Sequence, residues 1–148
     1  MQLLPIVICF IFGSCMDNIP SDLSVRNNSR KSIYSILSNS DKFIADGYYE
    51  EFQKDENHIK TKKDSIYSFV FTEIFPNATE PCHDGPLNWE EYFKSLPDGK
   101  IRMFIISKDS VEKYKWYKIF KNQVYIKKYE LTLQDLKDKK WEIVYNTN

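Results

Sequence analysis

The sequence predicts an α+β fold in a single domain, and two kinds of pattern support this assignment. In the N-terminal half, apolar and polar residues alternate in short runs, so we expect a mostly antiparallel sheet or a sandwich-like arrangement there. In the C-terminal half, capping sequences open short helices between strand-like runs. An aromatic content of 16% with only four glycines favours a packed core over a flexible chain.

A β-hairpin is predicted at the start of the domain. Residues 23–26 and 32–36 are strand-like, and the intervening residues 27–30 are rich in turn formers. A further alternating strand is expected at residues 65–72, after an acidic and aromatic stretch that we interpret as a long loop. Three prolines within residues 76–86 predict a break between the two halves of the chain.

The C-terminal half is predicted to begin with a short helix and a buried strand. Asn88 and Glu91 have the spacing of a capping box, and the sequence Pro-Asp-Gly at residues 97–99 predicts the end of that helix. Residues 101–106 are almost continuously apolar and too few for a buried helix. We therefore expect them to form a central strand that is covered on both faces.

A longer helix, a strand, a short helix and a closing strand complete the expected order. Asp109 is predicted to open the longer helix, and residues 123–131 are strand-like. Thr132 has the position of an N-cap for a helix of one to two turns. The closing strand is predicted from the alternation of three apolar residues, Trp141, Ile143 and Tyr145.

The first fifteen residues predict a cleaved membrane-targeting segment. Residues 3–12 are nearly all apolar, yet they are too few to span a bilayer as a helix, which needs about 20. Gly13 and Ser14 stand directly before Cys15. This ending resembles the lipobox of bacterial lipoproteins, in which the peptide is cut before a cysteine that then carries lipid.

The predicted domain organisation follows from that segment. Residues 1–14 form the lipoprotein signal peptide, with cleavage between Ser14 and Cys15, and Cys15 is lipidated with palmitate. Residues 15–22 comprise the lipidated cysteine and a polar tether, and residues 23–148 form one globular domain. Secretion without a lipid anchor remains an alternative, because an ordinary signal peptide also ends in small residues.

Several stretches of the domain resemble a group of small lipoproteins from gut Bacteroidetes. The likeness lies in residues 25–34, 96–106, 112–116 and 128–141. The resemblance implies an envelope location, with the protein anchored by lipid in the outer membrane and facing either the periplasm or the cell surface. The function of that group is not established, and the resemblance supplies no catalytic residue.

The sequence contains no recognisable catalytic, metal-binding or phosphate-binding motif. Cys82, His83 and Asp84 include the residue types of a catalytic triad, but consecutive side chains point apart, so we interpret them as an ordinary loop. The adjacent pairs at residues 50–51 and 90–91 suit a solvated surface better than acid–base catalysis. We therefore expect no enzymatic activity, no cofactor and no metal.

The charge distribution excludes a general attraction to nucleic acid, because basic and acidic residues both number 21. One segment is locally basic: residues 108–129 contain seven lysines and two acidic residues, interleaved with aromatic residues. This pattern suits either an amphipathic helix with a wet lysine face or a surface for an anionic partner. Both interpretations remain open from the sequence.

Trp116 is the most specific candidate within that basic segment. In a regular helix it lies about 200° from Tyr114, and therefore away from the apolar stripe that contains Tyr114. An exposed indole beside Lys113 and Lys115 is typical of a docking surface. These three residues are the predicted binding face.

The sequence thus predicts an envelope protein that binds a partner protein or a glycan without catalysing a reaction. A structural or assembly subunit of an envelope complex is the main alternative. An envelope hydrolase is a third, and it would need a site built from Cys82, His83 or the acidic loop.

Overall fold

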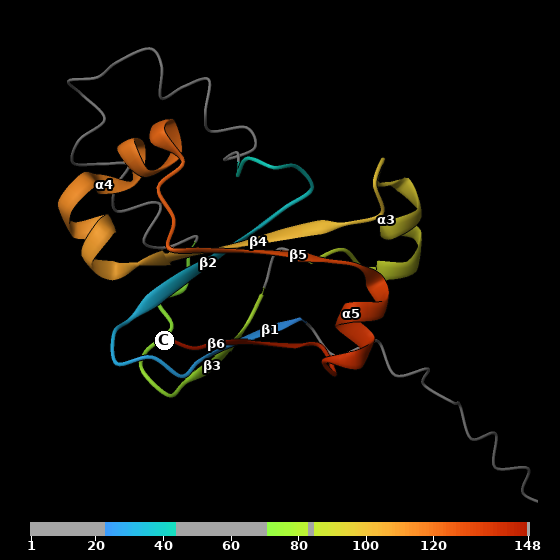
Figure 1. Ribbon diagram of the computed structural model, residues 1–148, viewed down its shortest axis with the longest axis horizontal. Helices are drawn as coiled ribbons and strands as arrows, with labels where there is room; N and C mark the ends of the chain where they lie inside the picture. Colours follow the sequence, from blue (N-terminus) through green and yellow to red (C-terminus); the bar gives the residue numbers. More distant parts are fainter. Residues whose placement is uncertain (1–22, 44–70, 83–84, 148) are drawn as a thin grey trace, which may run out of the picture.

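The computed structural model describes residues 23–43, 71–82 and 85–147 and shows an α+β fold. Two three-stranded sheets form its body (Figure 1). One sheet has the strand order β3-β1-β6 and the other the order β2-β4-β5. All described strand pairs are antiparallel except β1 with β6, so the expectation of a mostly antiparallel fold is confirmed for this part of the chain.

The first sheet joins the two ends of the described domain. Strand β1 (Ser24–Asn27) pairs with β3 (Thr79–Pro81) on one side and with the closing strand β6 (Glu142–Tyr145) on the other. Ile143 and Tyr145 of β6 are buried, as their alternation predicts. The proline-rich stretch 76–86 therefore contributes a strand and is more than a break between two halves.

The second sheet is built around the apolar strand β4 (Ile101–Ser107). It pairs with β2 (Ile33–Ser38) and with β5 (Lys127–Leu131), and residues 101–106 are all buried. The expected central, doubly covered strand is thus confirmed. The predicted strand at residues 123–131 is shorter in the structure, because residues before Lys127 connect it to the preceding helix.

Three described helices lie at opposite ends of the sheets (Figure 1). Helices α3 (Trp89–Ser95) and α5 (Leu133–Asp138) lie at one end, and α4 (Lys108–Asn122) lies at the other. Asn88 caps α3 through its side chain, which accepts hydrogen bonds from two backbone N–H groups, and Thr132 caps α5 in a complete capping box. Helix α4 begins at Lys108, one residue before the predicted start at Asp109. Its N-cap is Ser107.

The side chains of β4 alternate between two cores. Ile101, Met103 and Ile105 enter a core shared by both sheets and by α3 and α5, whereas Phe104 and Ile106 enter a second core under α4. We call the second one the aromatic core. Its buried members are Tyr34, Ile36, Phe43, Phe71, Phe104, Ile106, Trp116, Ile119 and Phe120.

The predicted hairpin of residues 23–26 and 32–36 is wrong. Strands β1 and β2 lie in different sheets, and each pairs with distant segments. The buried Asn27 side chain stabilises the passage of the chain from the first sheet to the second. Its amide group donates to the carbonyl oxygens of Lys31 and Ile74, at 2.8 and 2.9 Å. Its own carbonyl oxygen accepts from the N–H of Ser29 at 2.9 Å. The turn-rich stretch therefore carries the chain from one sheet to the other.

Several predictions fall outside the described residues. These are the signal peptide with Ser14 and Cys15, the tether, the expected strand up to residue 70 and the loop beyond Phe43. None of the helices within the described ranges has the length and hydrophobicity of a membrane span.

Candidate functional site

Helix α4, which contains the predicted binding face, is kinked in its middle. Lys115 has φ 61° and ψ 157°, whereas the residues around it are helical. A positive φ at a non-glycine residue is uncommon, and this combination with an extended ψ is nearly restricted to glycine. The kink therefore separates α4 into two short helical segments. Their side chains do not continue the same helical periodicity around the axis.

The kink buries Trp116. Its side chain is 2% exposed, and its ring lies 5.0 Å from Tyr34, 4.8 Å from Phe71 and 6.1 Å from Phe120, measured between ring centroids. These separations are typical of packed aromatic pairs. Trp116 is therefore part of the aromatic core, together with Ile119, which follows three residues later.

The prediction that Trp116 is exposed is therefore wrong, for an identifiable reason. The angle of about 200° from Tyr114 assumes a continuous helix with 100° per residue. The kink at Lys115 resets this phase, so Trp116 starts a new buried stripe. Lys113 and Lys115, the other two residues of the predicted face, are exposed as expected.

Three exposed lysines of α4 form what we call the lysine face: Lys113, Lys115 and Lys118. Within the described part of the chain, none of the three forms an ion pair. The ammonium group of Lys113 lies 4.8 Å from the ring centroid of Tyr114, which is a cation–π geometry. The lysine face thus offers positive charge to solvent.

Two other lysines of the predicted basic segment do not belong to this face, because acidic partners neutralise them. Lys108 Nζ donates to Glu73 at 2.9 Å, and Lys128 Nζ donates to Glu130 at 2.9 Å and to Asp41 at 3.3 Å. Burial alone would raise the pKa of Glu73, but hydrogen bonding from Lys108 holds that pKa below its ordinary value. Among the described residues, acidic side chains therefore leave the charges of Lys113, Lys115 and Lys118 on α4 unpaired, and also that of Lys127 on β5, whose ammonium group lies 5.8 Å from the ring centroid of Tyr129.

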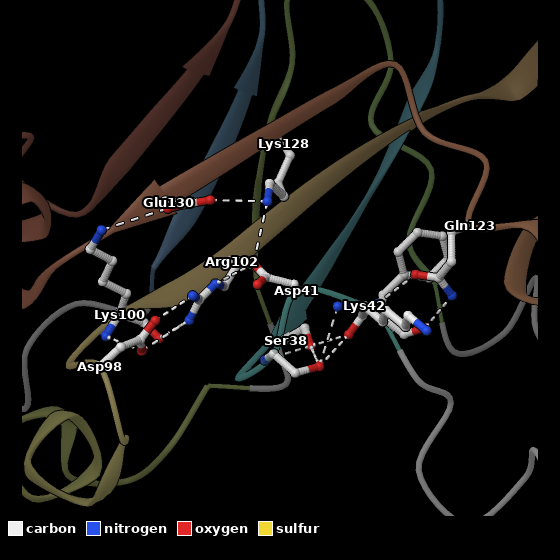
Figure 2. Close-up of polar contacts among 11 residues, drawn as sticks. Ser38, Asp41, Lys42, Asp98, Lys100, Arg102, Gln123, Lys128 and Glu130 are labelled. Carbon is white, nitrogen blue, oxygen red and sulfur yellow. Dashed lines mark hydrogen bonds and ion pairs between the residues drawn. The ribbon is translucent and has the colours of Figure 1, made fainter.

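A second polar feature is the charge network around Arg102, which Figure 2 shows between Asp98 and Asp41. The Arg102 side chain is only 8% exposed. Its Nε donates to Asp41 at 3.2 Å, and its Nη1 donates to Asp98 and to the carbonyl oxygen of Lys100, each at 3.0 Å. A second guanidinium nitrogen also contacts Asp98, so the pair has the two-pronged geometry that arginine favours with carboxylates.

The acidic members of this network are held in their charged form. Hydrogen bonding from Arg102 lowers the pKa of Asp98, and hydrogen bonding from Lys128 lowers the pKa of Asp41. Lys128 likewise lowers the pKa of Glu130. Carboxylates with lowered pKa values form ion pairs with the neighbouring lysine and arginine side chains. They are unsuited to donate a proton near neutral pH.

The network holds the segment that leads from β2 to Phe43 against the sheet. At the far end of that segment, the backbone N–H of Phe43 donates to Gln123 Oε1, and Gln123 Nε2 donates to the carbonyl oxygen of Phe43, both at 2.9 Å (Figure 2). Gln123 also donates to Phe120 at 2.8 Å. This segment is thus fixed to both the sheet and the end of α4.

The sequence reasoning missed Arg102, although the sequence contains a signal for it. Arg102 is the one charged residue in the apolar run 101–106, and its alternation places it on the face of Phe104 and Ile106. A charge on a covered strand needs a partner, and Asp98 stands four residues earlier. Asp41 is distant in the sequence, and no local pattern identifies it.

The remaining candidates for chemistry are not assembled into a site by the described residues. Cys82 is half-buried with its Sγ 3.9 Å from Ser35 Oγ, while His83 and Asp84 lie outside the described ranges. Glu90 pairs with Lys137 at 3.0 Å, which lowers the pKa of Glu90. Among the described residues, no group of three or more potential metal ligands comes together.

Comparison with known proteins identifies no relative. No protein-family model, no curated protein and no solved structure matches this chain significantly.

Proposed function

We propose that this chain is a lipid-anchored envelope protein whose domain binds a partner protein or a glycan without catalysing a reaction. The lysine face of α4 is the proposed contact surface, and its exposed positive charge is the observation that carries the proposal. An anionic partner, such as an acidic glycan or an acidic protein surface, would complement it. The two sheets, which we propose to be a sandwich-like scaffold, would support this surface.

The position of the lysine face supports a role in partner binding. The backbone N–H of Ser24, at the start of β1, donates to the carbonyl oxygen of Trp141 just after α5. The chain therefore enters the domain at the end formed by α3 and α5, and α4 lies at the opposite end (Figure 1). An anchor at Cys15 would therefore attach the domain through the end opposite the lysine face.

The absence of catalysis is proposed from the state of the described acidic groups. A general acid at neutral pH needs a raised pKa. The pKa values of Asp41, Glu73, Asp98 and Glu130 are instead lowered by cationic neighbours. Such groups act as partners for fixed cations, which supports a structural role for these ion pairs.

Exposed apolar residues favour a second candidate function, that of an assembly subunit. Tyr125 and Ile126 are 42% and 45% exposed, and they lie three and four residues after the last residue of α4, Asn122. Exposed aromatic and aliphatic side chains of this kind are typical of protein–protein contacts. A partner protein that covers Tyr125 together with the lysine face would indicate assembly, whereas a soluble acidic glycan would contact the lysines alone.

Replacing the three lysines of the lysine face by glutamine should reduce partner binding by at least tenfold. A photo-crosslinker at Asn122, next to this face, should trap the partner in the native envelope, and polygalacturonate is a defined acidic glycan for titration. Binding should weaken as salt is raised, because exposed charges are screened.

Lys94, Lys139 and Lys140, exposed at the opposite end of the domain, provide the matched control. Their replacement by glutamine removes the same number of charges and should leave binding unchanged. Equal losses from both triple variants would show that net charge alone matters. Unchanged binding after replacement of the lysine face would contradict its proposed role.

Lipidation has its own test. We predict that Cys15→Ala releases the protein from the membrane fraction or leaves its precursor uncut, because the lipid-carrying sulphur is lost. Metabolic labelling with palmitate, followed by fractionation, measures both outcomes. Ser14→Gly keeps both Cys15 and a small residue before it, and is the control that should retain the label. Palmitate that remains on the Cys15→Ala protein would refute the assignment.

A further inference from the structure

Strand β5 is an edge strand of the second sheet, and its outer side carries backbone groups that have no partner among the described residues. The N–H of Ile126 donates to the carbonyl oxygen of Ile105 at 2.8 Å, so the backbone of Ile105 points toward β5. Ile105 lies opposite Lys127. In an antiparallel pair, hydrogen-bonded and non-hydrogen-bonded positions alternate. The N–H and carbonyl groups of Lys128 and Glu130 therefore point away from β4.

The outer side of β6, an edge strand of the first sheet, differs because a side chain of β5 contacts it. The carbonyl oxygens of Trp141 and Tyr145 accept from N–H groups on the β1 side, at 2.9 and 2.8 Å. By alternation, the carbonyl oxygen of Val144 points outward, and the Tyr129 hydroxyl donates to it at 3.2 Å. Tyr129 thus fixes β5 to the other sheet and leaves the outward backbone groups of β5 unused.

The side chains of β5 place opposite charges on one face of this edge. Lys128 and Glu130 are two residues apart, and their ammonium and carboxylate groups lie 2.9 Å from each other (Figure 2). Tyr129, between them, packs against the core on the other face. A second β5 strand that runs in the opposite direction about Tyr129 would therefore present glutamate opposite Lys128 and lysine opposite Glu130.

We propose that β5 pairs with β5 of a second copy of this chain, antiparallel and centred on Tyr129, which joins two three-stranded sheets into one. In this register, the outward N–H and carbonyl groups of Lys128 bond to those of Glu130 in the second copy, and the reverse bonds form as well. The contact uses the same surface of both copies, so it closes as a dimer and leaves neither β5 edge open.

Charge favours this register over its neighbours. The next antiparallel registers that match outward backbone groups are centred on Lys128 or on Glu130, and they place two lysines or two glutamates opposite each other. Opposite charges across a strand pair are stabilising, and like charges are destabilising. Charged residues on an edge strand usually prevent pairing with another sheet. Here the order lysine, tyrosine, glutamate permits one self-pairing and disfavours the others.

Charge reversal tests the pairing, because two reversed charges can compensate each other across the contact. The wild type should show a weak, concentration-dependent monomer–dimer equilibrium in sedimentation velocity, since the contact is short. Lys128→Glu or Glu130→Lys alone places like charges opposite each other and should weaken dimerisation by about tenfold or more. An equimolar mixture of the two variants should recover dimers, as should the double variant, because every opposing pair is complementary again.

Lys139→Glu and Asp138→Lys, at exposed positions where α5 ends, are the matched charge controls. Each alone should dimerise as the wild type does, and mixing them should add nothing. Circular dichroism of each variant checks the fold. The double variant at Lys128 and Glu130 keeps one lysine and one glutamate on the strand, so it remains informative where a single reversal disturbs folding.

A backbone variant tests the same edge without relying on charge. Glu130→Pro removes an outward N–H and no bond to β4, so it should abolish dimers while the monomer stays folded. Glu130→Gln removes the same charge but keeps that N–H, and it should retain more of the dimer. A wild type that is monomeric up to about 1 mM, or reversals that do not compensate each other, would overturn the proposal. None of these measurements depends on the lysine face or on the lipid anchor.

Discussion

Trp116→Ala should destabilise the domain by about 3–5 kcal/mol, the range observed when a buried large aromatic side chain is truncated. The indole is 2% exposed and packs against Tyr34, Phe71 and Phe120. Truncation leaves a void among these rings, which cannot close it fully because Tyr34 is held in β2 and Phe120 in α4. Urea denaturation of the purified domain, monitored by circular dichroism, measures the loss.

Two controls separate burial from other effects of this substitution. Trp116→Phe keeps an aromatic ring in the core and should cost clearly less than alanine. Lys118→Ala lies on the exposed side of the same helix and should change stability by less than about 0.5 kcal/mol. A Trp116→Ala variant as stable as Lys118→Ala would mean that the indole is not in the core and that α4 is straight.

The features that the sequence predicts well are those controlled by nearby residues. The caps at Asn88 and Thr132 depend on side chains that reach N–H groups two or three residues away. The burial of β4 is visible in its own continuous apolar run. In each case the physical cause lies within a few residues of the element, so the local pattern is sufficient.

The hairpin prediction failed because strand pairing is decided at long range. Residues 27–30 suit a tight turn, and a turn is present, but the Asn27 amide bonds to the backbone of Ile74 as well as to nearby Lys31. The β1 strand then pairs with β3 and β6, which lie far along the chain. Turn composition shows where the chain bends, but it does not specify which strand the next segment joins.

The candidate site shows the same limit. The exposure of Lys113 and Lys115 follows from a local charge pattern, and it was predicted. The burial of Trp116 depends on the kink at Lys115. Helix α4 contains no glycine or proline that would predict a kink, because the kink results from the packing at both ends of the helix. Periodicity assumes an unbroken helix, so it placed Trp116 on the wrong side.

Arg102→Met should destabilise the domain by about 1.5–3 kcal/mol at neutral pH, the typical value of hydrogen bonds to charged groups. Methionine keeps much of the buried aliphatic volume, so the loss reports mainly on the bonds to Asp98, Asp41 and the carbonyl oxygen of Lys100. The substitution should also loosen the segment that ends at Phe43. Amide hydrogen exchange at Phe43 would detect this, since its N–H bonds to Gln123.

Matched variants distinguish the effect of the bidentate Arg102–Asp98 ion pair from the effect of a positive charge alone. Arg102→Lys keeps the positive charge but cannot contact Asp98 with two nitrogens, so it should lose a large part of the same free energy. Glu130→Gln removes an exposed charge from the edge of the network and should cost much less than either change at Arg102. Equal stability of the arginine and lysine forms would contradict the proposed geometry.

The cost of Arg102→Met should depend on pH in a defined direction. The pKa values of Asp98 and Asp41 are lowered in the folded state, by Arg102 and by Lys128 respectively. A lowered folded-state pKa gives stabilisation that is present above the unfolded-state pKa, about 3.9 for aspartate, and is lost as pH falls through the folded-state pKa. The difference between wild type and Arg102→Met should therefore be constant from pH 5 to 8 and shrink below about pH 4. Urea midpoints measured for both proteins at pH 7 and pH 3 give this difference directly, and a larger difference at pH 3 would show that the Arg102 guanidinium does not stabilise these carboxylates in their charged form.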